Sequence, residues 1–307
     1  MKAEINKSIE LVQILLFLSE QQDKTFQRIG NKTYINSISK WFSPFKNHSA
    51  VQLTREQIIS KNFVHIKPLC AILSLDSIIM DSRHELHNWA AAVKKFIADT
   101  DFDNFFYSQE PYYKWILDNV NLCKYDEWID FIEKYFRQKP DDFNLIICPI
   151  NGNYGFTLNK NGKQTAYTVR FMPKYDENGN YTWEYDYFAK GIAHEYAHCF
   201  VNPTVEKHVD ILNKHKDFFN KHRNIPNFYN TDYAVINEYF VRAFQIRFME
   251  LNKTKFPNFD IGKEYLFQKE SFIFIDDFVS ALKQFEISTV NFSEFYICKI
   301  DEILDNI

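Results

Sequence analysis

The sequence predicts an α+β fold that is mostly helical, with one small, largely antiparallel sheet. Three observations lead to this prediction. Apolar residues recur every three or four positions over much of the chain, which is the period of an amphipathic helix. Short β-branched runs separated by turn signals are confined to residues 143–184. Gly (7) and Pro (9) are scarce among the 307 residues, which argues against a turn-rich, all-β protein.

The N-terminal part, residues 1–142, is predicted to be helical. Residues 9–18 are apolar on nearly all sides, as in a buried helix. Residues 87–100 and 126–137 carry apolar side chains at helical spacing. The last of these helices should end before Pro140, because proline disfavours the helical conformation of the residue that precedes it.

Residues 143–252 are predicted to form the core of the fold, a sheet followed by helices. Asn159-Lys160-Asn161-Gly162 lies between two short strand-like runs, which is typical of a β-hairpin. Helical spacing returns near Asp186. We expect that helix to stop at Asn202-Pro203, because proline lacks the backbone N–H that a helix interior requires.

Two more helices are expected in this core, over residues 204–222 and 232–251. Residues 253–307 should add two or three further helices, the last running from Ser293 to the end. No Gly-, Ser- or Pro-rich linker separates these parts, so we predict one compact domain spanning residues 1–307.

Composition excludes several classes of protein. The net charge of −4 argues against a nucleic-acid-binding protein, because such proteins usually carry an excess of positive charge. No run of about 18 uncharged apolar residues exists, so we expect no membrane span. An odd number of widely spaced cysteines without a CxxC pair predicts buried free thiols in place of a disulfide framework or a thiolate metal site. These five are Cys70, Cys123, Cys148, Cys199 and Cys298.

Residues 194–198, His-Glu-Tyr-Ala-His, form an HExxH motif. On a helix, residues four apart lie on the same face, so both imidazoles can grip one metal ion. Glu195 would lie beside the metal, where it can hold and deprotonate a bound water. Random placement gives about 0.02 such motifs in a chain of this composition. The alternative is a structural helix that happens to carry two histidines, with Glu195 in an ion pair.

A tetrahedral zinc site of this type needs a third protein ligand. The metzincin pattern would need Gly at Val201 and His at Thr204, and neither is present. We choose Glu238, because it lies in mid-helix among apolar residues and a buried carboxylate requires a compensating cation. The metal ligands are then His194, His198 and Glu238, and the cofactor is Zn²⁺. The alternative compensator is Arg242, at the i, i+4 spacing of an ordinary helix ion pair.

The HEYAH motif followed by an NEYFVRA-type helix resembles the gluzincin branch of zinc metallopeptidases. More closely, the chain is similar to an uncharacterised bacterial family, a domain of unknown function with features of secreted peptidases. One departure from the gluzincin pattern concerns Arg242, which stands where many gluzincins carry an Asp that orients the first His; Arg242 would instead hold Glu238 or bind substrate. The segments that carry the wider likeness are residues 6–18, 41–51, 151–156 and 194–203.

The resemblance implies a zincin-like fold, in which a sheet lies over the HExxH helix and its edge strand binds an extended peptide. It also implies metal-assisted hydrolysis in which Glu195 takes the proton of the water and later passes it to the leaving amine. A donor must stabilise the oxyanion, and Tyr233, Tyr239 and Arg242 are the candidates near Glu238.

The leading interpretation is a zinc-dependent peptidase that hydrolyses peptide bonds of a peptide or protein through a metal-activated water. Two alternatives are a zinc hydrolase with a non-peptide substrate, and a catalytically idle zincin-fold binding protein. The intact Glu195 argues against the idle protein, because binding alone needs no base. The apolar segment at residues 9–18 is not expected to be a signal peptide, because it has neither the basic flank nor the small-residue cleavage site of one. The resemblance favours a secreted or periplasmic location, and the cytoplasm is the alternative.

Overall fold

The computed structural model describes residues 3–19, 31–61, 86–121, 125–150, 152–171, 174–175, 181–182, 185–221 and 231–307. The chain divides into two compact units, each made of several segments. Unit 1 comprises Met1–Cys123, Asn144–Tyr154 and Val169–Glu184, and unit 2 comprises Lys124–Phe143, Gly155–Thr168 and Tyr185–Ile307. Whether both belong to one domain, as the sequence predicts, is not decided by this division, so that statement stays a prediction.

Unit 1 is built mainly from helices, as predicted for the N-terminal part. Asn6 caps the first helix by accepting hydrogen bonds from the backbone N–H groups of Ser8 and Ile9. That helix packs on α4, and α4 packs on α6. The described helices of this unit are α1 (Lys7–Leu18), α3 (Lys32–Phe42), α4 (Ser49–Lys61), α6 (His87–Thr100), α7 (Phe102–Ser108) and α8 (Glu110–Asn121), with a 3-10 turn, η1, at Ser43–Phe45.

A buried carboxyl group interrupts the apolar surface of α1. The Glu10 side chain lies in the core of unit 1, where the Tyr34 hydroxyl donates a hydrogen bond of 2.5 Å to it. The Tyr34 hydroxyl also lies 2.7 Å from that of Tyr113. Burial raises the pKa of Glu10 to about 7, because the hydrogen bond from Tyr34 only partly offsets the loss of solvation. Glu10 therefore stays protonated in the folded chain over most of the acidic range.

This shift predicts how the stability of the protein depends on pH. The unfolded chain ionises Glu10 near its ordinary pKa of 4.5, and the folded chain only near 7. The stabilising contribution is therefore complete below pH 4.5 and is lost as the pH rises to 7, by up to about 3 kcal/mol. We expect Glu10→Gln to remove this decline in urea unfolding curves recorded between pH 4.5 and 7.5. Glu56→Gln, which alters an exposed glutamate on α4, should keep it; equal pH slopes for Glu10→Gln and wild type would contradict the assignment.

The small sheet has the strand order β1 (Asp142–Cys148), β3 (Lys163–Phe171), β2 (Tyr154–Lys160), and it is mixed. Residues of all three strands are divided between the two units. The predicted hairpin joins β2 to β3 through Asn161 and Gly162, whose φ angles of 53° and 77° are those that a two-residue hairpin turn requires. A second, two-stranded ladder pairs β4 (Lys174–Tyr175) with β5 (Tyr181–Thr182).

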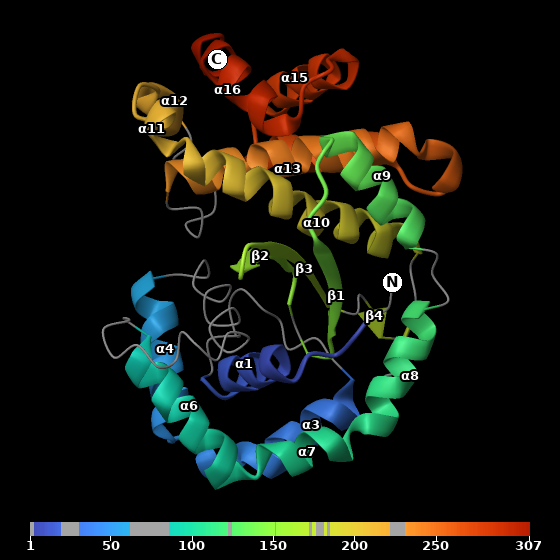
Figure 1. The fold of residues 1–307 in the computed structure, drawn as a ribbon. Coiled ribbons are helices and arrows are strands. Elements are labelled where there is room, and N and C mark those ends of the chain that lie inside the picture. Colours follow the sequence, from blue (N-terminus) through green and yellow to red (C-terminus); the bar gives the residue numbers. More distant parts are fainter. Residues whose placement is uncertain are drawn as a thin grey trace. The chain divides into compact units, whose positions relative to one another are not determined.

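Unit 2 is organised around two long helices, α10 (Tyr185–Lys207) and α13 (Asp232–Leu251), which lie side by side (Figure 1). The predicted helix at 232–251 is therefore confirmed, and Thr231 is its N-cap. α9 and α16 pack on α10, and α14 and α15 pack on α13. The bounds are α9 (Asp126–Phe136), α11 (Val209–Leu212), α12 (Lys216–Lys221), α14 (Ile261–Ser271), α15 (Ile275–Ile287) and α16 (Phe292–Asp305), with a 3-10 turn, η4, at Lys253–Lys255.

Aromatic rings hold the helices of unit 2 together. Phe136 of α9 stacks on Phe200 of α10, with ring centroids 4.8 Å apart and planes 9° from parallel. The same Phe136 ring contacts Phe244 of α13 and Phe292 of α16. One side chain therefore ties four helices together, and it fixes the position of the HExxH helix relative to α13.

The predicted stop at Asn202-Pro203 is wrong, because α10 continues through Pro203 to Lys207. Proline removes one helical hydrogen bond, but Thr204 and Val205 beyond it are buried, and the Thr204 hydroxyl bonds to the Phe200 carbonyl at 3.0 Å. Tertiary burial thus overrides the local signal. The prediction of one continuous helix over residues 204–222 is also wrong, because that stretch contains the end of α10 and then two short helices, α11 and α12.

β2 passes very close to the HExxH helix at Gly155. A Cβ atom built on this glycine would lie 1.7 Å from the carbonyl oxygen of Glu195 and 3.2 Å from the Cβ atom of His198. No side chain fits in that space, so the two backbones could not approach as they do with any other residue at 155.

We expect Gly155→Ala to destabilise the protein by about 3 kcal/mol, at the upper end of the cost of overpacking, because the obstructing atom is backbone and cannot swing away. Thermal unfolding followed by circular dichroism measures this loss. Gly262→Ala is the matched control, since its new Cβ would meet nothing closer than 3.4 Å and helix α14 favours alanine. A Gly155→Ala protein as stable as the control would refute the close approach.

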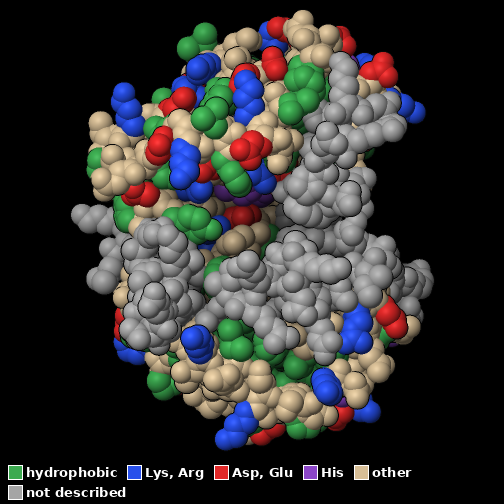
Figure 2. Space-filling model, turned by 180° about the vertical axis from the view of Figure 1, so that it is seen from behind, with side chains coloured by type: hydrophobic (Ala, Val, Ile, Leu, Met, Phe, Trp, Pro, Cys, Tyr) green, Lys and Arg blue, Asp and Glu red, His purple; other side chains and the backbone are tan. Residues whose placement is uncertain are grey.

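The surface carries mixed charge. On the face drawn in Figure 2, acidic and basic side chains of the described residues are interspersed. Among the described helices, none has the length and apolarity needed to cross a lipid bilayer. Cys148 and Cys199 are buried free thiols as predicted, whereas Cys298 is exposed, so the prediction was wrong there. Cys70 and Cys123 lie outside the described residues.

Candidate metal centre

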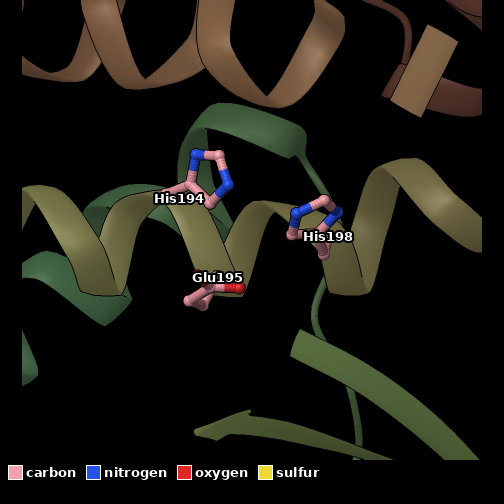
Figure 3. A group of neighbouring side chains, drawn as sticks. All are labelled: His194, Glu195 and His198. Carbon is pink, nitrogen blue, oxygen red and sulfur yellow. The ribbon is translucent and has the colours of Figure 1, made fainter. Parts of the chain in front are cut away.

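The HExxH residues lie on α10 as predicted. Figure 3 shows the imidazoles of His194 and His198 projecting from one side of the helix, one turn apart, with Glu195 leaving it in another direction. One potential ligand atom from each of the three residues lies within 4.8 Å of the others. His198 and Glu195 are buried, and the side chain of His194 is 16% exposed. Two imidazoles and a carboxylate thus converge on one small region of unit 2.

Glu238 of α13 faces the same two imidazoles. Its Oε1 lies 3.4 Å from Nε2 of His198, and its Oε2 lies 3.8 Å from Nε2 of His194. Two ligands of a tetrahedral zinc ion, each about 2.0–2.1 Å from the metal, would be about 3.3–3.4 Å apart. The structure therefore brings the three side chains chosen from the sequence as metal ligands together, and the distance between His198 and Glu238 matches this spacing.

Arg242 binds the carboxylate that the histidines face. Its Nε lies 3.0 Å from Oε2 of Glu238, one helical turn away. Burial alone would raise the pKa of Glu238, but Arg242 and the two imidazoles hold it well below its usual range. The sequence left two partners open for Glu238, Arg242 or a metal held by the histidines. In the structure the Glu238 carboxylate contacts Arg242 and also faces both imidazoles. Glu238 is thus kept as an anion in a buried position.

The second ring nitrogen of each histidine contacts a side-chain amide oxygen. Nδ1 of His194 lies 2.9 Å from Oε1 of Gln245, and Nδ1 of His198 lies 3.0 Å from Oδ1 of Asn202. An amide oxygen only accepts, so the Nδ1 atom of each imidazole carries a proton in this arrangement. Burial lowers the pKa of His194 well below its usual range, more than the Glu238 carboxylate raises it. That imidazole is therefore neutral at pH 7, as a metal ligand must be.

A wider hydrogen-bond network connects these groups to α14. Gln245 donates through its Nε2 to Oε1 of Glu264 at 3.1 Å, and Gln268 donates to the same oxygen at 2.7 Å. Arg242 donates from its Nη1 to Oε1 of Gln268 at 2.6 Å. Lys190 of α10 pairs with Oε2 of Glu264 at 2.9 Å. Arg242 is thus paired with Glu238, and Lys190 is paired with Glu264.

Sequence reasoning missed Asn202, Gln245, Glu264 and Gln268. Asn202 lies four residues after His198, a spacing that would have been informative had the helix been expected to continue through Pro203. Gln245 lies seven residues after Glu238 on the same helix, so it faces the same way two turns on. Glu264 and Gln268 come from α14, and nothing in the sequence connects that helix with the motif.

The structure separates the three candidates for an oxyanion donor. Arg242 contacts Glu238, and its guanidinium carbon lies 4.4 Å from the centre of the Phe272 ring. Tyr239 belongs to the aromatic core, because its ring stacks on Phe278 at 4.4 Å and its hydroxyl accepts a hydrogen bond of 3.5 Å from the Phe274 N–H. Tyr233 is half-buried in the first turn of α13. We therefore give Tyr239 a packing role and leave Tyr233 as a sequence prediction.

The donor atoms suit zinc. Two neutral imidazole nitrogens and one carboxylate are the protein ligands of a known class of zinc site with an open coordination position. A histidine that binds a metal through one ring nitrogen usually forms a hydrogen bond through the other. Here Nδ1 of His194 contacts Gln245 and Nδ1 of His198 contacts Asn202.

Residues 74–298 match the family model described as a domain of unknown function, DUF4932. The chain belongs to this family. The matched region is about three quarters of the chain and contains the sheet, α10, α13 and α14, so the whole candidate centre of this DUF4932 protein lies within the family domain. The expected membership of an uncharacterised domain family is confirmed, and the family description names no activity. No match was found among curated proteins or among solved structures.

Proposed function

We propose that this DUF4932 protein is a zinc-dependent peptidase of the gluzincin type. The observation that carries the proposal is the approach of two imidazoles, with their Nε2 atoms near a buried glutamate, beside a second glutamate in the HExxH motif. His194, His198 and Glu238 would hold the metal.

Bound zinc would polarise the scissile carbonyl and lower the pKa of water at the site. Glu195 lies beside the two imidazoles, where it would accept the proton of the attacking water and return it to the leaving amine. Arg242 would keep Glu238 ionised and in place, since it already holds that carboxylate. Asn202 and Gln245 would keep the two imidazoles in the tautomer that binds a metal through Nε2.

Peptide bonds are the proposed substrate because the HEYAH motif and the Glu238 helix together resemble gluzincin peptidases. A zincin-like arrangement is part of the proposal, and the contact of β2 with the HExxH helix at Gly155 supports it. Digestion of a peptide library with and without a chelator, read by mass spectrometry, tests the proposal directly. Chelator-sensitive cleavage supports it, and intact peptides with zinc-loaded protein would count against a peptidase.

Glu195→Gln should reduce turnover by about 10²–10⁴-fold while zinc binding is kept, because the amide has the same size but cannot accept the proton. The measurement is cleavage of the best library peptide, together with zinc content by atomic absorption. Glu206→Gln, an exposed change near the end of the same helix, is the control and should leave turnover unchanged. Full activity of Glu195→Gln would overturn the role of the base.

Glu238→Gln should weaken zinc binding by about 100-fold, because a charged ligand is replaced by a poor one. Competition with a chromogenic chelator measures the affinity. Glu250→Gln is the matched control, since Glu250 also pairs with an arginine on α13, Arg247, but does so away from the histidines. If both variants lose only thermal stability and keep the zinc affinity of the wild type, Glu238 is an ordinary ion-pair residue and the gluzincin assignment fails.

A further inference from the structure

A single carboxylate on α14 connects to both sides of the candidate metal centre. Oε1 of Glu264 accepts hydrogen bonds from the side-chain amides of Gln245 and Gln268, at 3.1 and 2.7 Å. Its Oε2 accepts from Lys190 at 2.9 Å, and the side chain is 11% exposed. Glu264 therefore uses both oxygens, and Lys190 balances its charge.

One branch leads from Glu264 to the first histidine. A glutamine side chain can present either its oxygen or its NH₂ group to a neighbour, so Gln245 alone would not decide which tautomer His194 adopts. A carboxylate only accepts, so Glu264 takes the NH₂ group of Gln245. The oxygen of Gln245 is then left facing Nδ1 of His194, at 2.9 Å. This places the proton on Nδ1 and leaves Nε2 unprotonated.

The other branch leads to the ligand carboxylate by the same logic. Glu264 takes the NH₂ group of Gln268, which directs the oxygen of that amide to Nη1 of Arg242 at 2.6 Å. The guanidinium, held there and against Phe272, donates its Nε–H to Glu238 at 3.0 Å. A planar guanidinium fixed at two of its nitrogens has little freedom to turn, so the position of Glu238 is fixed as well.

We propose that Glu264 is a positioning residue that orients two amides and, through them, sets the His194 tautomer and the placement of Glu238. The metal-binding consequence rests on the proposed function, whereas the control of the tautomer concerns the chain alone. The alternative is that Glu264 only forms a structural ion pair with Lys190. That role would not depend on the amides of Gln245 and Gln268.

The test compares Glu264→Gln with Glu270→Gln, the same change at an exposed site on the same helix. The first readout is the His194 tautomer in the metal-free protein at neutral pH, from ¹⁵N–¹H NMR of the imidazole. The second is the affinity for zinc chloride by chelator competition. We expect Glu264→Gln to convert a single Nδ1–H tautomer into a mixture and to weaken zinc binding by about 10–100-fold. Glu270→Gln should match the wild type in both.

Exchanging the amide at position 245 with the carboxylate at position 264 distinguishes a positioning role of Glu264 from a purely stabilising ion pair. Gln245→Glu alone places two carboxylates face to face and should weaken zinc binding as well. In the double variant Gln245→Glu/Glu264→Gln, the new carboxylate at 245 accepts from His194 and the new amide at 264 donates to it. We expect the double variant to regain the Nδ1–H tautomer and to bind zinc within about threefold of the wild type. An ion-pair role for Glu264 predicts that the double variant is no better than Glu264→Gln.

The outcomes are distinguishable from failure of the proposed function. If the wild type binds no zinc, the function fails, while the tautomer still tests the role of Glu264. An unchanged tautomer in Glu264→Gln, with a lower melting temperature, would overturn the proposal. Should Glu264→Gln not fold, Gln245→Met breaks the same branch and leaves the Lys190 pair intact. It should give the same tautomer mixture, and a wild-type tautomer in Gln245→Met would also overturn the proposal.

Discussion

The packing of α10 against α13 is the constraint on which the candidate centre depends, because it buries the Glu238 carboxylate against two imidazoles. A buried carboxylate is stable only when positive charge or strong donors surround it. Arg242 supplies the charge, and its presence keeps Glu238 ionised where a metal could bind. The aromatic contacts of Phe136 with Phe200 and Phe244 hold the two helices in this arrangement. The site therefore follows from how the core of unit 2 is packed.

Side-chain amides, with no charge of their own, contact the histidines. Asn202 and Gln245 bond to Nδ1 of the two imidazoles, and the carboxylate of Glu264 lies behind Gln245. An amide oxygen at Nδ1 accepts the ring proton and so stabilises the tautomer whose Nε2 can bind a metal. The arrangement thus suits histidines that act as neutral ligands.

The sequence predicted most of the elements that surround the site because their signals are local. The helix at 232–251, the helix at 87–100 and the hairpin turn at Asn161-Gly162 all follow from residue spacing and turn chemistry. The failures lie where tertiary contacts override a local rule. Pro203 is accommodated inside α10 because buried residues follow it, and that continuation is what places Asn202 one turn after His198.

The sequence by itself determined the HExxH face and the choice of Glu238. Four-residue spacing places both histidines on one side of any helix, and an acidic residue among apolar neighbours must have a compensating partner. Only the tertiary structure decided how these residues are held. Gln245 and Arg242 of α13 bond to Glu264 and Gln268 of α14, and no pattern in the sequence connects these two helices. Gly155 meets Glu195 from a strand 40 residues away. The physical reason is that hydrogen-bond partners between elements are chosen by packing geometry, which the periodicity of a single segment does not contain.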